Sequence, residues 1–454
     1  MSPSGRERPQ FTRPLTSLEI CAGAGGQAVG LHHAGFDHLG LVEWDAHAVD
    51  TLRANVGGWP GWGKERTDSL KPMDVNDFLT SEIYENLRSV LDVSKERLDL
   101  LAGGVPCPPF SLAGKQLGED DERDLFPAAL EIIEDLRPRA VMIENVRGIL
   151  EPPEVFIDYR RRILKDLRDF GYVVPEVKES WTAAEQDRAM RKVWRRIDAA
   201  HFGVPQLRPR AILVVIHEDV LKTADFDFVW PSEIKGKRAT VVDELAATME
   251  TRCRKYWSKN ERGERATAGD RTGRHVYQEW LRKASRAAEI GRGVAPTLVG
   301  GSKKHGGADL GPTRAKRAWA ALGVDGMGVA NDLDKCDPER DLFRPAGPML
   351  TVEQAAIIQG FPTDWKFQGR KTAQYRQVGN AFPPPVAEAV GRAIAAVLRP
   401  EHRDELLREY ELDVDGSSAD AQQAEQMTLP VSGRSITNSP PSVNRSGDLV
   451  RTSV

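Results

Sequence analysis

The chain has 454 residues, of which 40% are hydrophobic and 29% charged, and its formal net charge is -4 at pH 7. This composition is typical of a globular protein with two or three domains, and the mild acidity alone suggests no polyanionic partner. No apolar run approaches about 18 residues and the N-terminus is polar, which argues against a membrane span or secretory signal. The four cysteines are far apart without a C-x-x-C pair, which argues against a zinc site or disulfide framework and favours a reducing cytoplasm.

The first unit predicted is a strand, a glycine-rich turn and a helix. Residues 1–14 are expected to form a disordered arm, residues 15–20 a strand, residues 21–26 (CAGAGG) the turn, and residues 27–34 the helix. Such a unit opens nucleotide-binding α/β folds. The glycine spacing differs from the dinucleotide fingerprint, which disfavours a pyrophosphate ligand and an oxidoreductase of the Rossmann type.

Acidic residues after the following strands are candidates to bind a nucleoside. The predicted strand 39–42 ends at Glu43 and Trp44. A carboxylate about twenty residues after the glycines suits a pair of ribose hydroxyls, and Trp44 suits stacking on a base. Asp74 is the candidate at a third predicted strand end, with Asp68 as its competitor.

The segment GGVPCPPFS, residues 103–111, follows a buried strand predicted at 98–102. Two glycines allow a sharp bend and three prolines restrict the loop. Cys107 is therefore presented at the carboxyl end of a strand, where open α/β sheets place their reactive groups. A thiolate there can act as a nucleophile, and the alternative is a small buried cysteine in a proline-rich turn.

A further carboxylate follows the next predicted strand. A helix opens at residues 123–126, and the strand 140–143 then leads directly into Glu144. A carboxylate after a buried strand is costly unless it is hydrogen-bonded or used in chemistry. Glu144 is therefore a candidate site residue.

Basic residues dominate the next part of the chain. Helices are predicted at 160–170 and 183–196, and a strand at 211–216. Alternation along the extended chain before that strand places three polar side chains on one face: Gln206, Arg208 and Arg210.

From residue 217 to residue 344 the alternation of strands and helices fades, and Gly, Lys and Arg are interleaved with aromatic residues. Between Lys235 and Ala320 there are 20 Lys or Arg residues against 9 Asp or Glu residues. This excess indicates a phosphate-facing surface, with a solvated charged face as the alternative. The loop GGSKKHGG, residues 300–307, is the candidate to contact the groove of a nucleic-acid duplex.

Regular structure is predicted to return with a capped helix at 350–358 and a final amphipathic helix at 386–398. The sequence QVGNAFPPP, residues 377–385, lies between them. After about residue 415 the chain is rich in Ser, Gln, Asn and Pro, and we expect it to be disordered.

The motifs CAGAGG, PCPPFS, ENV, QLRPR and QVGNA occur here in an order that resembles the DNA (cytosine-5) methyltransferase family, from about residue 15 to residue 398. The resemblance implies an α/β fold: a Rossmann-like, S-adenosylmethionine-dependent methyltransferase core with a mostly parallel sheet, and a smaller irregular target-recognition domain. The implied divisions are a disordered arm (1–14), the catalytic core (15–217), the target-recognition domain with basic loops (218–345), a return to the core with the closing helix (346–400), and a largely disordered extension (401–454).

The resemblance also implies a mechanism. Cys107 would add to C6 of a cytosine flipped out of double-stranded DNA, and Glu144 would protonate or hydrogen-bond the ring N3. Arg210 would contact the cytosine O2, and Arg208 would lie against the loop or backbone near the nucleophile. The methyl donor would be S-adenosylmethionine.

Cofactor-binding residues follow from the same resemblance. They are Cys21, Ala22, Gly23, Gly25, Glu43, Trp44, Asp74, Val75, Pro106, Leu125, Asn380 and Ala381. The family usually has phenylalanine where this chain has Cys21, so we expect weaker or rearranged stacking on the adenine. Phe382 replaces the usual valine or isoleucine as a packing variant.

The expected setting is a monomer in the bacterial cytoplasm or nucleoid, as the modification arm of a restriction–modification system. A cognate endonuclease would be a functional and not a physical partner, and no membrane is involved. Two rival hypotheses remain: an RNA cytosine-5 methyltransferase, and a non-catalytic DNA-binding regulator on the same fold. Intact Cys107, Glu144 and Arg210 argue against the regulator.

Overall fold

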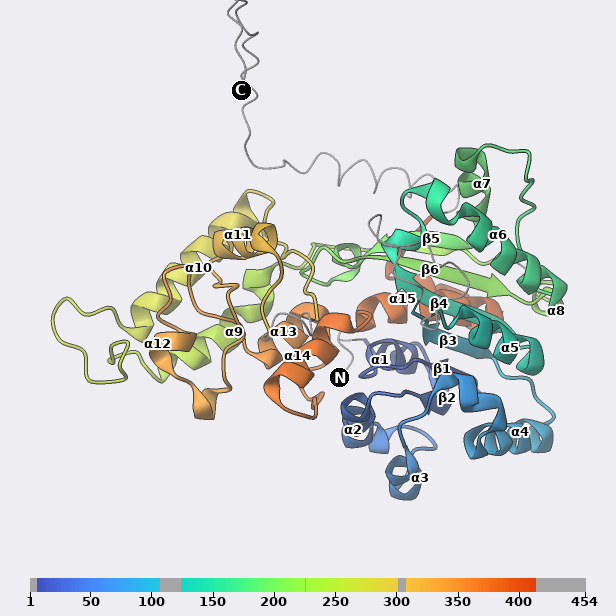
Figure 1. Cartoon of the computed structure of the whole chain (residues 1–454), viewed down its shortest axis with the longest axis horizontal. Helices are drawn as coiled ribbons and strands as arrows, with labels where there is room; N and C mark the ends of the chain where they lie inside the picture. The colour runs from blue at the N-terminus through green and yellow to red at the C-terminus, as the bar shows by residue number, and fades with distance from the viewer. Residues whose placement is uncertain (1–5, 107–123, 225, 301–307, 414–454) are drawn as a thin grey trace, which may run out of the picture.

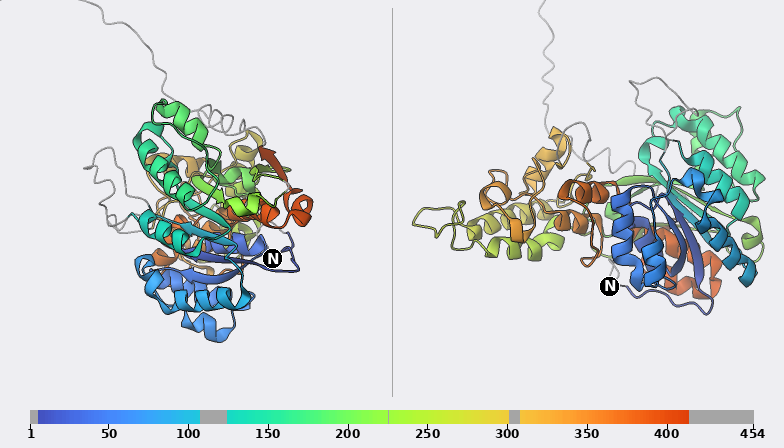
Figure 2. Two further views of the ribbon diagram at one scale, coloured as in Figure 1. Left: turned by 90° about the vertical axis from the view of Figure 1, so that its right-hand side faces the viewer. Right: turned by 60° about the horizontal axis from the view of Figure 1, so that its bottom comes forward.

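The structure, a computed structural model, describes residues 6–106, 124–224, 226–300 and 308–413. Two lobes lie at opposite ends of the long axis (Figures 1 and 2). The larger lobe contains the central sheet, and the smaller lobe is mainly helical. No helix in the described ranges is long and apolar enough to span a bilayer.

A six-stranded sheet forms the centre of the larger lobe, in the order β2-β1-β3-β4-β6-β5. Strands β1 to β4 run parallel, and β6 is antiparallel to both of its neighbours. The strands are β1 (Leu15–Ile20), β2 (Phe36–Val42), β3 (Leu100–Gly104), β4 (Ala140–Val146), β5 (Trp194–Asp198) and β6 (Pro209–Ile216). The expected α/β fold with a mostly parallel sheet is confirmed.

Helices cover both faces of this sheet (Figure 1). Alternation along β1 directs Leu18 and Ile20 to one face and Leu15 to the other. The first face is covered by α4 (Glu82–Ser94), α5 (Phe126–Leu136) and α6 (Pro153–Asp169), and the second by α1 (Gly26–His33) and α15 (Pro384–Leu398). The other helices of this lobe are α2 (Ala46–Asn55), α3 (Lys64–Ser69), α7 (Ala183–Met190), α8 (Glu218–Leu221) and α16 (Arg403–Leu407).

Helix α15 is enclosed on all sides, because every one of its 15 residues is buried. It approaches α1 closely at Gly30, where a Cβ atom would lie 2.3 Å from the Pro384 carbonyl oxygen. Its polar side chains pair with each other: Arg392 Nε donates to Glu388 at 3.0 Å, and Arg6 also contacts Glu388. The helix that the sequence predicted as amphipathic is therefore internal, with its polar side chains paired.

The smaller lobe has its own hydrophobic core. The sequence predicted little regular structure between residues 217 and 344, but that part contains α9 (Val241–Arg254), α10 (Gly273–Glu289), α11 (Thr313–Ala321) and α12 (Pro338–Asp341). The lobe also contains α13 (Val352–Gln359), which matches the helix predicted at 350–358, and α14 (Lys371–Asn380). Capping boxes at Thr240, Thr272 and Thr351 begin helices α9, α10 and α13, whose buried side chains belong to this core. Two further strands, β7 (Trp230–Ile234) and β8 (Tyr410–Asp413), pair on the larger lobe.

Four local expectations were wrong. Residues 6–14 lie against the core, where Arg8 pairs with Asp37. The segment around Asp74 follows α3 without forming a strand. Glu144 lies within β4, and the predicted helix 183–196 ends at Met190, after which the chain enters β5.

Candidate active site and cofactor-binding site

The predicted site residues meet at the carboxyl edge of the parallel strands. Cys21 follows β1, Glu43 follows β2, Gly104 ends β3, and Glu144 lies near the end of β4. This edge is where open α/β sheets bind ligands. The arrangement brings together residues that are up to 123 positions apart in the chain.

Glu43 links the glycine-rich turn to the end of β2. Its Oε2 accepts a hydrogen bond from the Gly23 backbone N–H at 2.7 Å, and its Oε1 accepts one from the Asp45 N–H at 2.8 Å. The side chain is buried, which raises the pKa of Glu43, while the backbone N–H groups act in the opposite direction. The carboxylate is therefore held in one orientation beside the turn.

The turn itself has a constrained backbone. Cys21 has φ 51° and Gly23 has φ 55°, so two residues near its start adopt left-handed conformations. Such a conformation costs a residue with a Cβ atom about 1–2 kcal/mol. The Ala22 N–H donates to the Val42 carbonyl at 3.0 Å, and the Gly25 N–H donates to the Ala22 carbonyl at 3.0 Å.

Trp44 and Asp74 lie beside Glu43. Trp44 is 73% exposed, so one large aromatic surface is open to a ligand. The Met73 N–H donates to the Glu43 carbonyl at 2.8 Å, which brings Asp74 to the same edge although no strand precedes it. Asp74 Oδ1 accepts hydrogen bonds from the backbone and side chain of Asn76.

The competing acid, Asp68, is in a different setting. It lies on α3 and pairs with Lys64 at 2.7 Å, with both side chains exposed. Burial raises the pKa of Cys21 to about 12, with contributions from the charges of Glu43 and Asp74. Val75, the next residue, is buried in the core.

Glu144 forms the opposite side of the site. Its Oε1 lies 2.7 Å from Arg210 Nε in an ion pair. Burial raises the pKa of Glu144, and the charges of Arg210 and Arg208 oppose that shift. A carboxyl group in this setting is suited to hold a proton and to deliver it.

Gly104 separates the turn from Glu144. A Cβ atom at this position would lie 3.3 Å from Glu144 Oε2 and 3.7 Å from the Cys21 carbonyl oxygen. Glycine therefore lets the glycine-rich turn and the Glu144 carboxylate approach the same point of β3. This point is three residues before Cys107 in the sequence.

The chain on either side of residues 107–123 is anchored to this edge. Asn145 Nδ2 donates to the Val105 carbonyl at 2.8 Å, and the Leu125 N–H donates to the Pro106 carbonyl at 3.3 Å. Pro106 and Leu125, both predicted cofactor contacts, thus adjoin each other. Cys107 itself lies outside the described residues.

Arg208 is the centre of a network that joins the two lobes. Its fully buried guanidinium donates to the carbonyl oxygens of Leu298 (2.7 Å), Gly379 (2.8 Å) and Ala381 (2.8 Å). The sequence predicted a position against the backbone near the nucleophile. In the structure its hydrogen bonds go to the closing segment and to the chain that returns from the smaller lobe.

Two glutamines that the sequence did not indicate as a pair complete this network. Gln206 Nε2 donates to Gln359 Oε1 at 2.7 Å, and Gln359 Nε2 donates to the Ala381 carbonyl at 2.5 Å. Gln206 Oε1 also accepts from the Leu298 N–H at 2.6 Å. Both side chains are completely buried. The sequence singled out only Gln206, as a polar residue before a buried strand.

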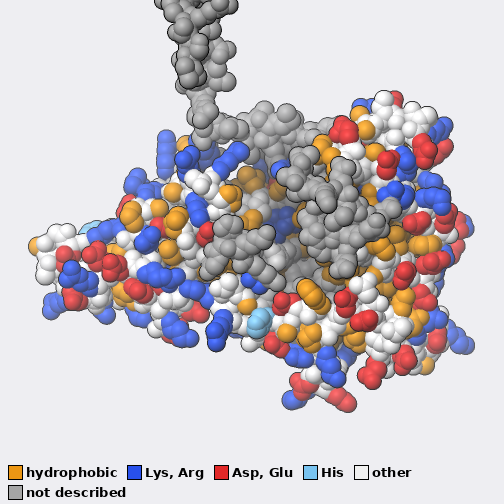
Figure 3. All heavy atoms as spheres, in the orientation of Figure 1, with side chains coloured by type: hydrophobic (Ala, Val, Ile, Leu, Met, Phe, Trp, Pro, Cys, Tyr) orange, Lys and Arg blue, Asp and Glu red, His pale blue; other side chains and the backbone are white. Residues whose placement is uncertain are grey.

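The closing segment contains the last predicted cofactor residues. Asn380 ends α14, and a Cβ atom at Gly300 would lie 2.2 Å from its Oδ1 atom. The first residue of the predicted groove-contacting loop therefore touches this segment; residues 301–307 lie outside the described ranges. Figure 3 shows Lys and Arg side chains on the smaller lobe and within the hollow between the lobes.

Comparison with known proteins agrees with this geometry. Residues 15–396 match the family model of the C-5 cytosine-specific DNA methylases. The chain is 46% identical over 388 residues to the type II methyltransferase M.NaeI of Lentzea aerocolonigenes, covering 85% of this chain and 76% of that protein. It is 38% identical over 392 residues to the type II methyltransferase M.NgoMIV of Neisseria gonorrhoeae, covering 86% of this chain and 99% of that protein. The chain therefore belongs to the C-5 cytosine-specific DNA methylase family and is a DNA (cytosine-5) methyltransferase.

Proposed function

We propose that the chain methylates C5 of a cytosine flipped out of a specific double-stranded DNA sequence, through a covalent bond between Cys107 and C6 of the base. The observation that carries this proposal is the meeting of the glycine-rich turn and Glu144 at Gly104. A cofactor held by the turn and a base held by Glu144 would be adjacent there. Cys107 follows this point in the chain by three residues.

The residues present fit S-adenosylmethionine. Glu43 is held by two backbone N–H groups and suits the ribose hydroxyls, and Trp44 offers an exposed ring to the adenine. In the described part of the chain, Asp74 Oδ2 has no hydrogen bond and suits the adenine amino group. When bound, the cofactor supplies an electrophilic methyl group.

Cysteine addition would make the base reactive. The Cys107 thiolate forms a bond to C6 while Glu144 protonates or hydrogen-bonds N3, so that electron density reaches C5. After C5 has taken up the methyl group, loss of the C5 proton to water breaks the C6–sulfur bond and restores the aromatic ring. The thiolate is regenerated. Arg210, which pairs with Glu144, would contact the cytosine O2.

The base must leave the helical stack before this chemistry, which costs a few kcal/mol. We assign the compensating contacts to the smaller lobe, whose Lys and Arg residues suit DNA phosphates. The naming of both relatives as type II methyltransferases supports a role in restriction–modification, with an endonuclease as a functional partner. We infer a cytoplasmic monomer.

The test is methyl transfer from radiolabelled S-adenosylmethionine to mixed duplex DNA and to RNA. Cys107→Ser should abolish transfer to DNA, whereas Cys336→Ser, a change of a half-buried thiol that packs against the core of the smaller lobe, should retain it. Transfer to RNA alone would overturn the assignment of the substrate. Full activity of Cys107→Ser would overturn the mechanism.

A further inference from the structure

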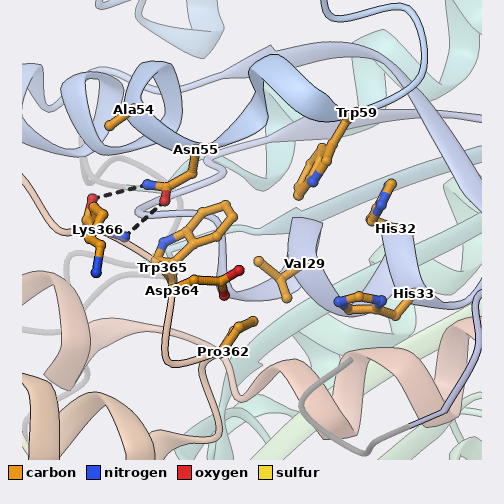
Figure 4. A pocket seen from close by; sticks show the side chains of 10 residues that line it. All are labelled: Val29, His32, His33, Ala54, Asn55, Trp59, Pro362, Asp364, Trp365 and Lys366. Carbon is orange, nitrogen blue, oxygen red and sulfur yellow. Dashed lines mark hydrogen bonds between the residues drawn. The ribbon is translucent and has the colours of Figure 1, made fainter. Parts of the chain in front are cut away.

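A separate pocket of about 360 Å³ lies between the C-terminal half of α1, the end of α2 and residues 362–366 (Figure 4). We call it the α1–α2 pocket. It is lined by none of the residues predicted to bind the cofactor or to act on the base. Its walls combine aromatic rings and one carboxylate.

Aromatic rings form one side of the α1–α2 pocket. The Trp59 ring stacks on His32, with ring centroids 4.5 Å apart and an angle of 5° between the planes. The Trp365 ring lies 5.9 Å from Trp59. Tryptophan faces attract cations through the quadrupole of the ring.

The charge directed into the pocket is negative. The Asp364 carboxylate points toward Val29, which lines the pocket, whereas the Lys366 ammonium points away from the pocket (Figure 4). Within the described ranges, Asp364 has no ion pair. Burial lowers the pKa of His32 to about 2 and also lowers the pKa of His33, so both rings are uncharged near neutral pH.

We propose that the α1–α2 pocket binds a small organic cation through an alkylammonium group. The positive charge would face Asp364 and the Trp365 ring. The alkyl part would contact Val29. A neutral alcohol of the same length lacks the positive charge, and a simple metal cation lacks the alkyl part.

The pocket shares a wall with the glycine-rich turn. Trp365 Nε1 donates to the Ala24 carbonyl at 3.1 Å. A Cβ atom at Gly25 would lie 2.8 Å from Trp365 Cζ2, so the ring packs directly on the turn. A cation that shifts Trp365 would change the affinity of the turn for its ligand, and by linkage that ligand would change the affinity for the cation. This coupling rests on the proposed cofactor site; the binding of the cation does not.

The first experiment is a ligand-observed NMR titration of the full chain with n-propylammonium chloride, without cofactor or DNA. We expect saturable binding that 1-propanol and sodium chloride do not reproduce. Asp364→Asn should weaken binding at least tenfold, and Asp92→Asn, an exposed carboxylate on α4, should leave it unchanged. Binding that does not saturate, that propanol matches, or that Asp364→Asn leaves intact would overturn the proposal.

The second experiment measures the dissociation constant of S-adenosylmethionine by calorimetry at constant ionic strength. Saturating n-propylammonium should change it at least twofold in the wild type and not in Asp364→Asn. Cation binding without any such change would overturn the coupling while the site stands. Failure of cofactor binding alone would count against the proposed function and not against the cation site.

Discussion

Replacing Arg208 by methionine tests whether this residue joins the lobes or takes part in the chemistry. The guanidinium makes three hydrogen bonds to carbonyl oxygens at 2.7–2.8 Å while completely buried. A hydrogen bond from a charged donor contributes about 1.5–3 kcal/mol, so three would give an upper bound of about 9 kcal/mol. The cost of burying the charge offsets part of this. We expect Arg208→Met to lower the free energy of unfolding by about 3–5 kcal/mol.

The assay is urea denaturation followed by tryptophan fluorescence, together with methyl transfer and cofactor binding under conditions where the variant is folded. Arg188→Met, a change of an exposed arginine on α7, is the matched control and should alter stability by less than about 0.5 kcal/mol. A loss below about 1 kcal/mol for Arg208→Met would refute the reasoning from its hydrogen bonds. Wild-type stability with abolished transfer would assign Arg208 to the chemistry.

Three further predictions concern acidic residues. Burial raises the pKa of Glu144, and the proposed reaction needs the protonated form, so kcat should fall as the pH rises through that pKa. Glu144→Gln should lower kcat about 10²–10⁴-fold, while the cofactor affinity measured by calorimetry should stay unchanged. Burial raises the pKa of Glu19 well above its usual value, so the folded state binds this proton more tightly than the unfolded chain does. The free energy of unfolding should therefore fall by up to about 1.4 kcal/mol per pH unit between the unfolded-state pKa and the folded-state pKa. Glu19→Gln should remove that component in urea melts at pH 5 and 8, and an unchanged slope would contradict it. Asp74→Asn should weaken S-adenosylmethionine binding about tenfold and Asp68→Asn should not, measured by calorimetry; the reverse result would make Asp68 the acceptor.

Local sequence patterns predicted the strands that build the site. Strand β1 spans the predicted residues 15–20, and helix α13 begins within two residues of the capped helix predicted at 350–358. The carboxyl-edge positions of Glu43 and Glu144 followed from buried runs before acidic residues. These signals lie within a few residues of the feature that they predict.

Features that depend on distant chain segments were not predictable in this way. Trp194 to Arg196 continue a basic, helix-like pattern, but pairing with β6 makes them part of a strand. Helix α15 has Glu388 and Arg392 on its sides, and it is internal because residues 6–14 and the chain after it cover those sides. The three carbonyl partners of Arg208 are 90 to 173 residues away.

The most direct test of the account is a covalent trap. Duplex DNA that carries 5-fluorocytosine is incubated with the protein and S-adenosylmethionine, and a denaturation-resistant adduct is sought on a gel. Fluorine cannot leave C5 as a cation, so an enzyme that adds to C6 stays attached. The account predicts an adduct on duplex DNA that mass spectrometry maps to Cys107 and that Cys107→Ser cannot form. An adduct at another residue, or none on duplex DNA despite measurable cofactor binding, would contradict it.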